Sequence, residues 1–69
     1  MTVEEYLKNE PQIKLAFIAG KMYPNNKSAN TYLINKLNGN DNRKFTKKDS
    51  ELAILALKDI CKDINKIKP

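Results

Sequence analysis

The chain is 69 residues long, which leaves room for one domain with a small hydrophobic core, and its formal net charge is +5. One cysteine and no histidine exclude a disulfide within the chain and come close to excluding a structural zinc site. No apolar run is long enough to span a bilayer, and the acidic first five residues lack the apolar stretch of a signal peptide. We therefore expect a cytoplasmic protein with no membrane partner.

The first predicted element is a short helix that begins after Thr2. Thr2 is a favourable N-cap residue, and Glu5 lies three residues further on, where it completes a capping box. The apolar stripe of this helix consists of Val3, Tyr6 and Leu7.

A second helix is predicted from Pro11, which suits the first helical position, to about Tyr23, because Pro24 disfavours helical backbone in the residue before it. Its apolar surface is wide, so we expect it to pack on two sides. The predicted core face consists of Ile13, Ala16, Phe17 and Gly20, widened by Leu15, Ile18 and Ala19.

A third helix is predicted to begin at Ser28, a strong N-cap residue that follows the turn-forming segment 24–27. It should end at Gly39, which can adopt the left-handed conformation that closes a helix. The residues expected to face the core are Ala29, Leu33 and Leu37, with Tyr32 and Lys36 flanking them and with Tyr23 and Tyr32 packed at the edge of the core.

The last predicted helix is capped by Thr46, with Asp49 at the capping-box position, and runs to about Lys66. Phe45, at the end of the polar loop 40–45, is expected to pack back into the core. The chain is thus predicted to be all-α. It forms one domain over residues 1–69, a compact bundle of four helices with a long C-terminal helix over about residues 46–66.

The last helix carries one thiol and several charges. Cys61 falls within its apolar pattern, so we expect an inert, packed thiol. Asp59 and Asp63 are interleaved with lysines, which indicates surface ion pairs of little energetic weight with Lys58, Lys62 and Lys66. No glycine-rich phosphate loop, metal-ligand cluster or nucleophile triad is present, so the sequence predicts a non-enzyme with no cofactor, metal or small-molecule substrate.

Positive charge is concentrated in the middle of the chain. Residues 21–48 hold seven basic side chains and one acidic side chain, a net of +6, whereas residues 1–20 carry −1 and residues 49–69 carry zero. A basic stripe around one helix and its flanking loop is typical of a domain that docks on phosphates. The alternative interpretation is that these basic side chains form only the solvated face of a basic protein.

The second and third helices, separated by a polar turn, form a candidate helix-turn-helix over about residues 11–39. An α-helix fits the major groove of DNA, and the residues in its first turns reach base edges. The predicted base-contacting residues are Ser28, Asn30, Thr31, Ile34 and Asn35, which are otherwise surface residues of an amphipathic helix. The predicted phosphate-contacting residues are Lys27, Arg43, Lys44, Lys47 and Lys48.

The spacing Gln12-x3-Ala16-x3-Gly20 and the segment Ser28–Gly39, followed by Phe45–Asp49, resemble the first helix, the recognition helix and the next capped helix of a known family. This is the phage repressor and Cro-type, or lambda-repressor-like, helix-turn-helix family. The resemblance covers about residues 11–57. It implies a small phage- or mobile-element-type protein that reads operators as a dimer, with the recognition helix in the major groove.

The chain departs from the usual family pattern between these two helices. The glycine of the pattern normally lies in the turn, and the second helix starts soon after it. Here residues 21–26 separate Gly20 from the next helix. The base-reading positions can therefore be shifted by a residue or more relative to the family pattern.

The last helix also contains a possible dimer seam. Ala53, Leu57, Ile60, Ile64 and Ile67 are spaced four, three, four and three residues apart, as in a heptad repeat. Residues beyond about Ile60 are predicted to project past the core and pair with a second copy, so the predicted homodimer interface is Leu57, Ile60, Ile64 and Ile67. The alternative is that the whole apolar stripe packs against the core of its own chain.

The function favoured by these patterns is sequence-specific binding of double-stranded DNA, as a transcriptional regulator or a phage-type accessory factor. One alternative is a protein-interaction module that uses the basic helix pair or the C-terminal helix. Another is non-specific nucleic-acid binding. The lack of an aromatic cluster argues against a platform for single strands.

Overall fold

The structure is a computed structural model that describes residues 1–9 and 13–68, the side chain of Asp41 excepted. It contains four α-helices, α1 (Val3–Lys8), α2 (Leu15–Met22), α3 (Ala29–Asn38) and α4 (Lys47–Asn65), and one turn of 3-10 helix, η1 (Asn40–Asn42). No strand occurs in these residues. The predicted all-α architecture with four helices and a long C-terminal helix is confirmed.

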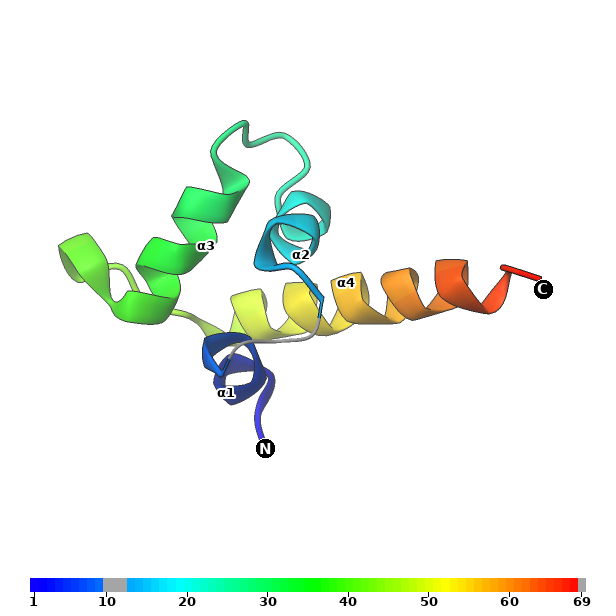
Figure 1. The fold of residues 1–69 in the computed structure, drawn as a ribbon. Coiled ribbons are helices and arrows are strands. Elements are labelled where there is room, and N and C mark those ends of the chain that lie inside the picture. The colour runs from blue at the N-terminus through cyan, green and yellow to red at the C-terminus, as the bar shows by residue number, and fades with distance from the viewer. Residues whose placement is uncertain (10–12, 69) are drawn as a thin grey trace.

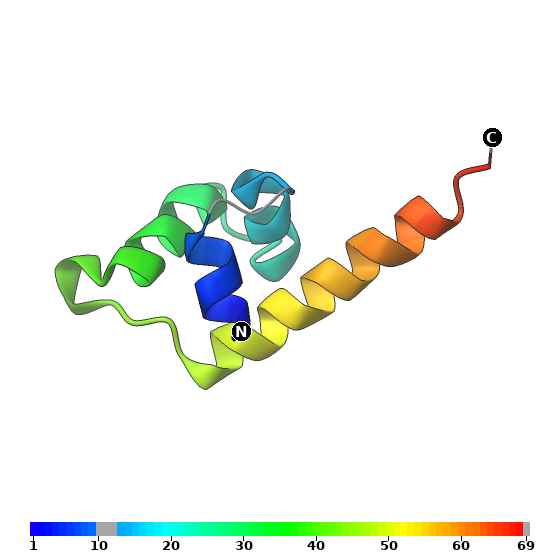
Figure 2. The ribbon, with the colours of Figure 1, turned by 60° about the horizontal axis from the view of Figure 1, so that its bottom comes forward.

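Helix α4 is the longest helix and supports α1 and α2, whereas α3 packs mainly on α2 (Figure 1). Helix α2 packs against both α3 and α4, and α1 contacts α3 and α4. The two views agree that the C-terminal half of α4 extends away from the other helices (Figure 2). The molecule is accordingly elongated, with principal extents of 45 × 28 × 19 Å.

The hydrophobic core lies where the four helices meet. Ile18 of α2 and Leu33 of α3 are its two largest fully buried side chains. The other buried apolar residues are Leu7, Ala19, Met22, Ala29, Leu37, Ala53 and Ala56. The small alanines of α4 allow α2 to approach that helix closely, and the predicted buried stripe of α3 is confirmed.

Several predicted helix ends are confirmed by their hydrogen bonds or dihedral angles. Thr2 and Glu5 form a capping box at α1, and Thr46 and Asp49 form one at α4. Gly39 ends α3 in the left-handed conformation, with φ 70°. Phe45 is partly buried against the core, as expected from the sequence.

The second helix begins later than predicted and buries a different face. It starts at Leu15, with Lys14 as its N-cap, while the predicted start at Pro11 lies outside the described residues. The spacing that starts from Leu15 selects Ile18, Ala19 and Met22 for the core. The predicted core residues Ala16, Phe17 and Gly20 are exposed instead, Phe17 by 64%.

The thiol of Cys61 is exposed, so the prediction of a packed cysteine was wrong. The reason is the direction of the buried stripe of α4, which runs through Ala53 and Ala56 and reaches Ile60. Cys61 is the next residue and is therefore turned by about 100° from Ile60, away from that stripe.

Removal of core volume at Leu33 should destabilise the fold strongly. Leu33→Ala removes a fully buried side chain that joins α3 to α2, and such truncations cost about 2–5 kcal/mol. The same truncation at Leu55, which is 63% exposed on α4, should change the free energy of unfolding by less than about 0.5 kcal/mol. Urea unfolding followed by circular dichroism measures both, and equal losses would contradict the placement of Leu33 in the core.

Candidate nucleic-acid interface

Helix α3 has one face fixed in the core and another exposed to solvent. Ala29, Leu33 and Leu37 are buried, whereas Asn30 and Thr31 in the first turn are exposed. Two of the predicted base-contacting residues therefore lie on an accessible surface next to the N-terminus of the helix.

Ser28 is the residue before α3, but it does not cap the helix as predicted. Its side chain makes no capping hydrogen bond. The side chain of Asn26 instead accepts a hydrogen bond of 2.9 Å from the backbone N–H of Ser28 and closes the turn. The exposed hydroxyl group of Ser28 is thus not committed to capping α3.

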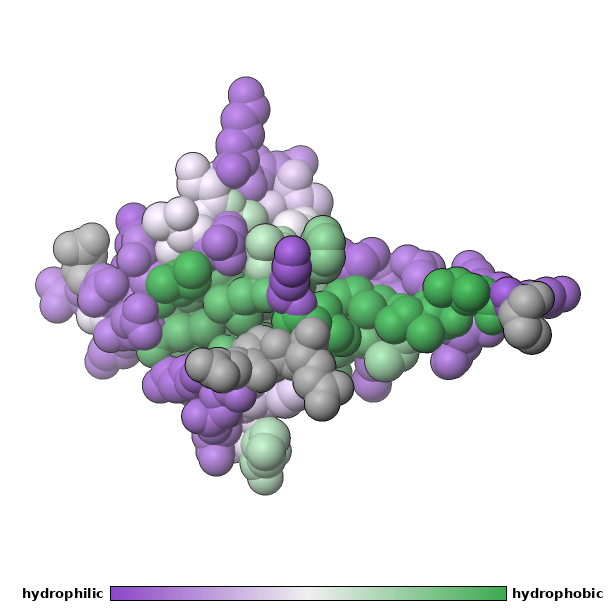
Figure 3. Space-filling view, viewed as in Figure 1, coloured by the Kyte–Doolittle hydropathy of each residue, from purple (hydrophilic) through white to green (hydrophobic). Residues whose placement is uncertain are grey.

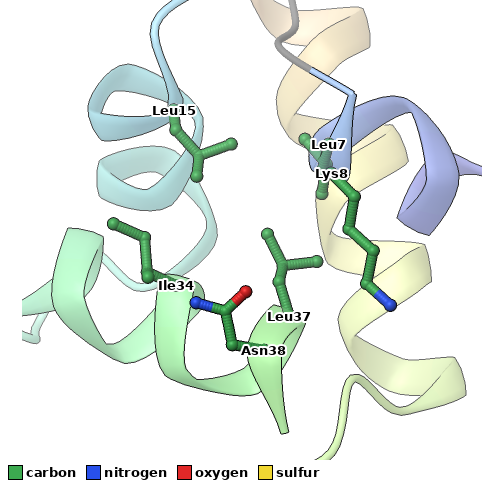
Figure 4. Close-up of a pocket in the computed structure, with 6 residues that line it drawn as sticks. All are labelled: Leu7, Lys8, Leu15, Ile34, Leu37 and Asn38. Atoms are coloured by element: carbon green, nitrogen blue, oxygen red, sulfur yellow. The ribbon is translucent and has the colours of Figure 1, made fainter.

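The remaining two predicted base contacts are less accessible. Ile34 is 37% exposed and lines a hollow of about 480 Å³ between α1, α2 and α3, where it faces Leu15 (Figure 4). Asn35 is half-buried, and its side-chain oxygen accepts a hydrogen bond of 3.3 Å from Asn40. Asn30 and Thr31 are consequently the stronger candidates for reading bases.

Asn38 is not among the predicted base-contacting residues, yet it is exposed at the rim of the same hollow. It lies seven residues after Thr31 and three after Asn35, so all three share one side of α3. This i, i+4, i+7 spacing was present in the sequence and could have identified Asn38 as part of the polar face.

The orientation of α3 on α4 is held by the buried carboxylate of Asp49. The hydroxyl of Tyr23 donates a hydrogen bond of 2.6 Å to Oδ1, and Lys36 Nζ lies 3.0 and 2.9 Å from the two oxygens. The backbone N–H and the hydroxyl of Thr46 donate to Oδ2 at 2.9 and 2.8 Å. One carboxylate thus joins the α2–α3 connection, α3 and the start of α4.

These hydrogen bonds favour the charged form of the carboxylate. Burial by itself would raise the pKa of Asp49, but the hydrogen bonds from Tyr23, Thr46 and Lys36 outweigh burial and hold the pKa at about 2. Burial and the bond to Asp49 raise the pKa of Tyr23, which therefore stays a neutral donor. Burial opposes the charge of Lys36, but its bond to Asp49 raises the pKa of Lys36.

Two aromatic rings and two cations lie in contact beside the Asp49 node, the hydrogen-bonded cluster of Asp49, Tyr23, Lys36 and Thr46. The rings of Tyr23 and Tyr32 meet edge to face with their centroids 4.9 Å apart, and Tyr23 packs against the core, as predicted for it. Lys36 Nζ lies 4.7 Å from the centroid of Tyr32, and the guanidinium of Arg43 lies 5.3 Å from it. Tyr32 therefore holds Arg43 beside α3.

The structure divides the seven basic side chains of residues 21–48 into two groups. Lys36 pairs with Asp49, and Lys21 of α2 pairs with Asp59 and lies 3.8 Å from Asp63. Asp59 and Asp63 thus pair with Lys21 of α2 rather than with the predicted lysines of α4. The other five are exposed and form no ion pair with any side chain that the structure describes: Lys27, Arg43, Lys44, Lys47 and Lys48.

These five cations are the predicted phosphate contacts, but they do not form one cluster. Lys27 precedes α3, whereas Arg43 and Lys44 follow its other end, about 15 Å away along the helix. Arg43 and Lys44 line a hollow of about 360 Å³ together with Lys8 and Lys36. Hydrophilic residues accordingly form the outer edge of the visible face around α3, while hydrophobic residues run through its middle and out along α4 (Figure 3).

Comparisons with protein-family models, with curated proteins and with solved structures give no match to this chain. Among the described residues, no helix has the length and apolar character needed to cross a membrane. No group of three or more metal-ligating side chains comes together within that same part of the chain. The candidate site is therefore defined by its polar helix face and its exposed cations.

The lowered pKa of Asp49 predicts that the fold loses stability in acid. Because the pKa falls from 3.8 in the unfolded chain to about 2 in the fold, the carboxylate stabilises the fold above about pH 4. This contribution of about 2 kcal/mol is lost as the pH falls through about 2. Urea unfolding between pH 6 and pH 2 measures the loss, and the side-chain carboxyl ¹³C shift of Asp49 should titrate near pH 2. Titration of that carboxyl near pH 4 would show that the hydrogen bonds to Asp49 do not favour its charged form.

Loss of the Asp49 charge should also be costly at neutral pH. Asp49→Asn leaves the ammonium group of Lys36 without its counter-charge in a half-buried site, and breaking a buried pair in this way costs about 3–5 kcal/mol. Asp59→Asn is the matched control, because it removes an ion pair that is exposed to solvent. Thermal unfolding should show a large fall in Tm for Asp49→Asn alone.

Proposed function

We propose that the protein binds double-stranded DNA in a sequence-dependent manner, with α2 and α3 as a helix-turn-helix of the phage repressor and Cro type. In this assignment α3 enters the major groove and Asn30 and Thr31 contact base edges. Such a protein would act as a transcriptional regulator or as an accessory factor of a phage or mobile element.

The observation that carries the proposal is the exposed polar face at the N-terminal end of a firmly anchored helix. Leu33 holds α3 in the core, and Lys36 bonds it to Asp49 of α4. The side chains of Asn30 and Thr31 consequently project from a fixed backbone. A backbone fixed in this way loses little conformational freedom on binding, which favours discrimination between bases.

The distribution of cations supports the same assignment. Lys27 at one end of α3 and Arg43 and Lys44 at the other can contact phosphates on the two sides of a groove. Lys47 and Lys48 add positive charge at the start of α4, where the helix dipole also favours an anion. A helix whose two ends carry cations is suited to lie between two phosphate backbones.

Removal of an end cation should weaken binding to all duplexes alike. Arg43→Ala or Lys44→Ala should reduce the slope of log K against log salt by roughly one unit, because one fewer counterion is released. Lys66→Ala is the matched control, since it removes one exposed charge from the far end of α4. Fluorescence anisotropy at several salt concentrations gives the slopes. An equal effect of Lys66→Ala would show that only the net charge matters.

Substitution of a base-reading residue should have a different signature. Asn30→Ala should reduce the preference for the best duplex over random sequence by roughly 1–3 kcal/mol, the discrimination of one bidentate contact. Asn25→Ala, in the connection before α3, should leave that preference unchanged. Selection from a random duplex library followed by competition binding provides the measurement. Equal losses on specific and random DNA would remove Asn30 from the reading face.

The main competing function is docking of an acidic protein on the same cations. Titration of the wild-type protein with a duplex at low salt separates the two functions. DNA binding should shift the backbone amide resonances of residues 27–35 and 43–48. A folded domain that shows no such shifts with any duplex of a random pool would overturn the proposal in favour of a protein partner.

A further inference from the structure

The exposed side chains of α3 form one narrow face that carries no charge. The remaining residues of the helix are buried or half-buried. At about 100° per residue, the exposed ones fall within an arc of about 100° around the helix axis. This arc, called the reading face below, consists of Asn30, Thr31, Ile34 and Asn38.

The one cation of α3 is held away from the reading face. Lys36 is turned by at least about 120° from each residue of that face. Its ammonium group lies 2.9 Å from the carboxylate of Asp49, and its side chain is only 14% exposed. Lysine and arginine are the side chains that bind guanine through O6 and N7. The ion pair therefore withdraws from the groove the guanine reader that α3 would otherwise offer.

Arg43 is held on the same far side of the helix. Its guanidinium lies 5.3 Å from the centroid of the Tyr32 ring. Tyr32 in turn is rotated by at least about 100° from every residue of the reading face. Lys27 precedes the helix and is assigned to the phosphate backbone beside the groove. Neither cation thus adds a guanine contact to the reading face.

Helix α3 also lacks a group that reads cytosine. The amino group of cytosine is a donor, and the side chains that accept from it are aspartate and glutamate. Residues 29–38 contain neither of these. The carboxylate that does contact α3, that of Asp49, is 2% exposed. A G·C pair would therefore meet no charged partner on the reading face for either of its bases.

The side chains that are present on the reading face match A·T pairs. The amide groups of Asn30 and Asn38 each offer a donor and an acceptor side by side, the pattern that complements N7 and N6 of adenine. Thr31 and Ile34 carry methyl groups, which suit apolar contact with the C5-methyl group of thymine. Every side chain of the face can thus contact one base of an A·T pair.

We infer that α3 recognises A·T base pairs in the major groove, with Asn30 bound to adenine and the methyl group of Thr31 against thymine. The inference rests on the proposed function and narrows it, because it names the base pairs at which α3 docks. The exposed cations at the two ends of the helix supply affinity for any sequence, whereas the uncharged reading face selects A·T.

The inference does not depend on how many copies of the chain bind. Within the predicted dimer interface, Leu57 and Ile60 pack partly against the core of their own chain, whereas Ile64 and Ile67 are exposed. A random region of roughly 30 base pairs accommodates one half-site or two half-sites a helical turn apart. The base preference is then read within each half-site.

Selection of duplexes from such a library by the full chain is the first test. The positions at which Asn30→Ala and Thr31→Ala lose their preference should be A·T pairs. Replacing one of these pairs by G·C should weaken wild-type binding by about 5- to 150-fold. Lys27→Ala should bind all duplexes more weakly with the same base preference. G·C pairs at those positions would overturn the inference alone, whereas selection of no sequence would overturn the proposed function as well.

Inosine separates contacts in the major groove from an effect of DNA shape. A preference for A·T can also arise from the narrow minor groove or the flexibility of A·T-rich DNA. An inosine·cytosine pair presents the major-groove atoms of G·C but lacks the amino group that marks G·C in the minor groove. At the selected positions it should therefore bind as weakly as G·C. Binding as strong as that of A·T would overturn the inference.

A variant with a guanine reader provides the converse test. Asn30→Arg places a guanidinium on the exposed first turn of α3, so the preference at one position should switch from A·T to G·C. Asn25→Arg is the matched control, because it adds the same charge in the exposed connection before α3 and should strengthen binding to all duplexes without a switch. An unchanged preference in Asn30→Arg would overturn the contact of Asn30 with adenine.

Discussion

The fold depends on one buried carboxylate more than on any other polar group. Asp49 is 2% exposed and receives hydrogen bonds from Tyr23, Lys36 and the residue that caps its own helix. A small core offers little hydrophobic area, so the directional bonds of this node add what the apolar contacts lack, a defined orientation of α3 on α4. Arg43 lies on the ring of Tyr32, so the same node also sets the position of a candidate phosphate contact.

Ion pairs within the chain determine which basic side chains of residues 21–48 remain accessible to a binding partner. From the sequence, all seven basic residues of 21–48 contribute equally to the net charge. In the fold, Lys36 and Lys21 are held by aspartates of α4, and the cations left open are those before α3, after η1 and at the start of α4. The open positive charge is consequently arranged around the ends of α3 rather than spread over α2.

Most of the fold could be predicted from local signals, and the errors have physical causes. Both capping boxes, the glycine stop at Gly39 and the buried stripe of α3 depend on residues close in sequence, and all were confirmed. The face of α2 was wrong because a helix with apolar residues nearly all round leaves the choice of face to its tertiary partners. The Asp49 node was missed as a network because it joins residues 13 and 26 positions apart, a contact that no periodicity shows.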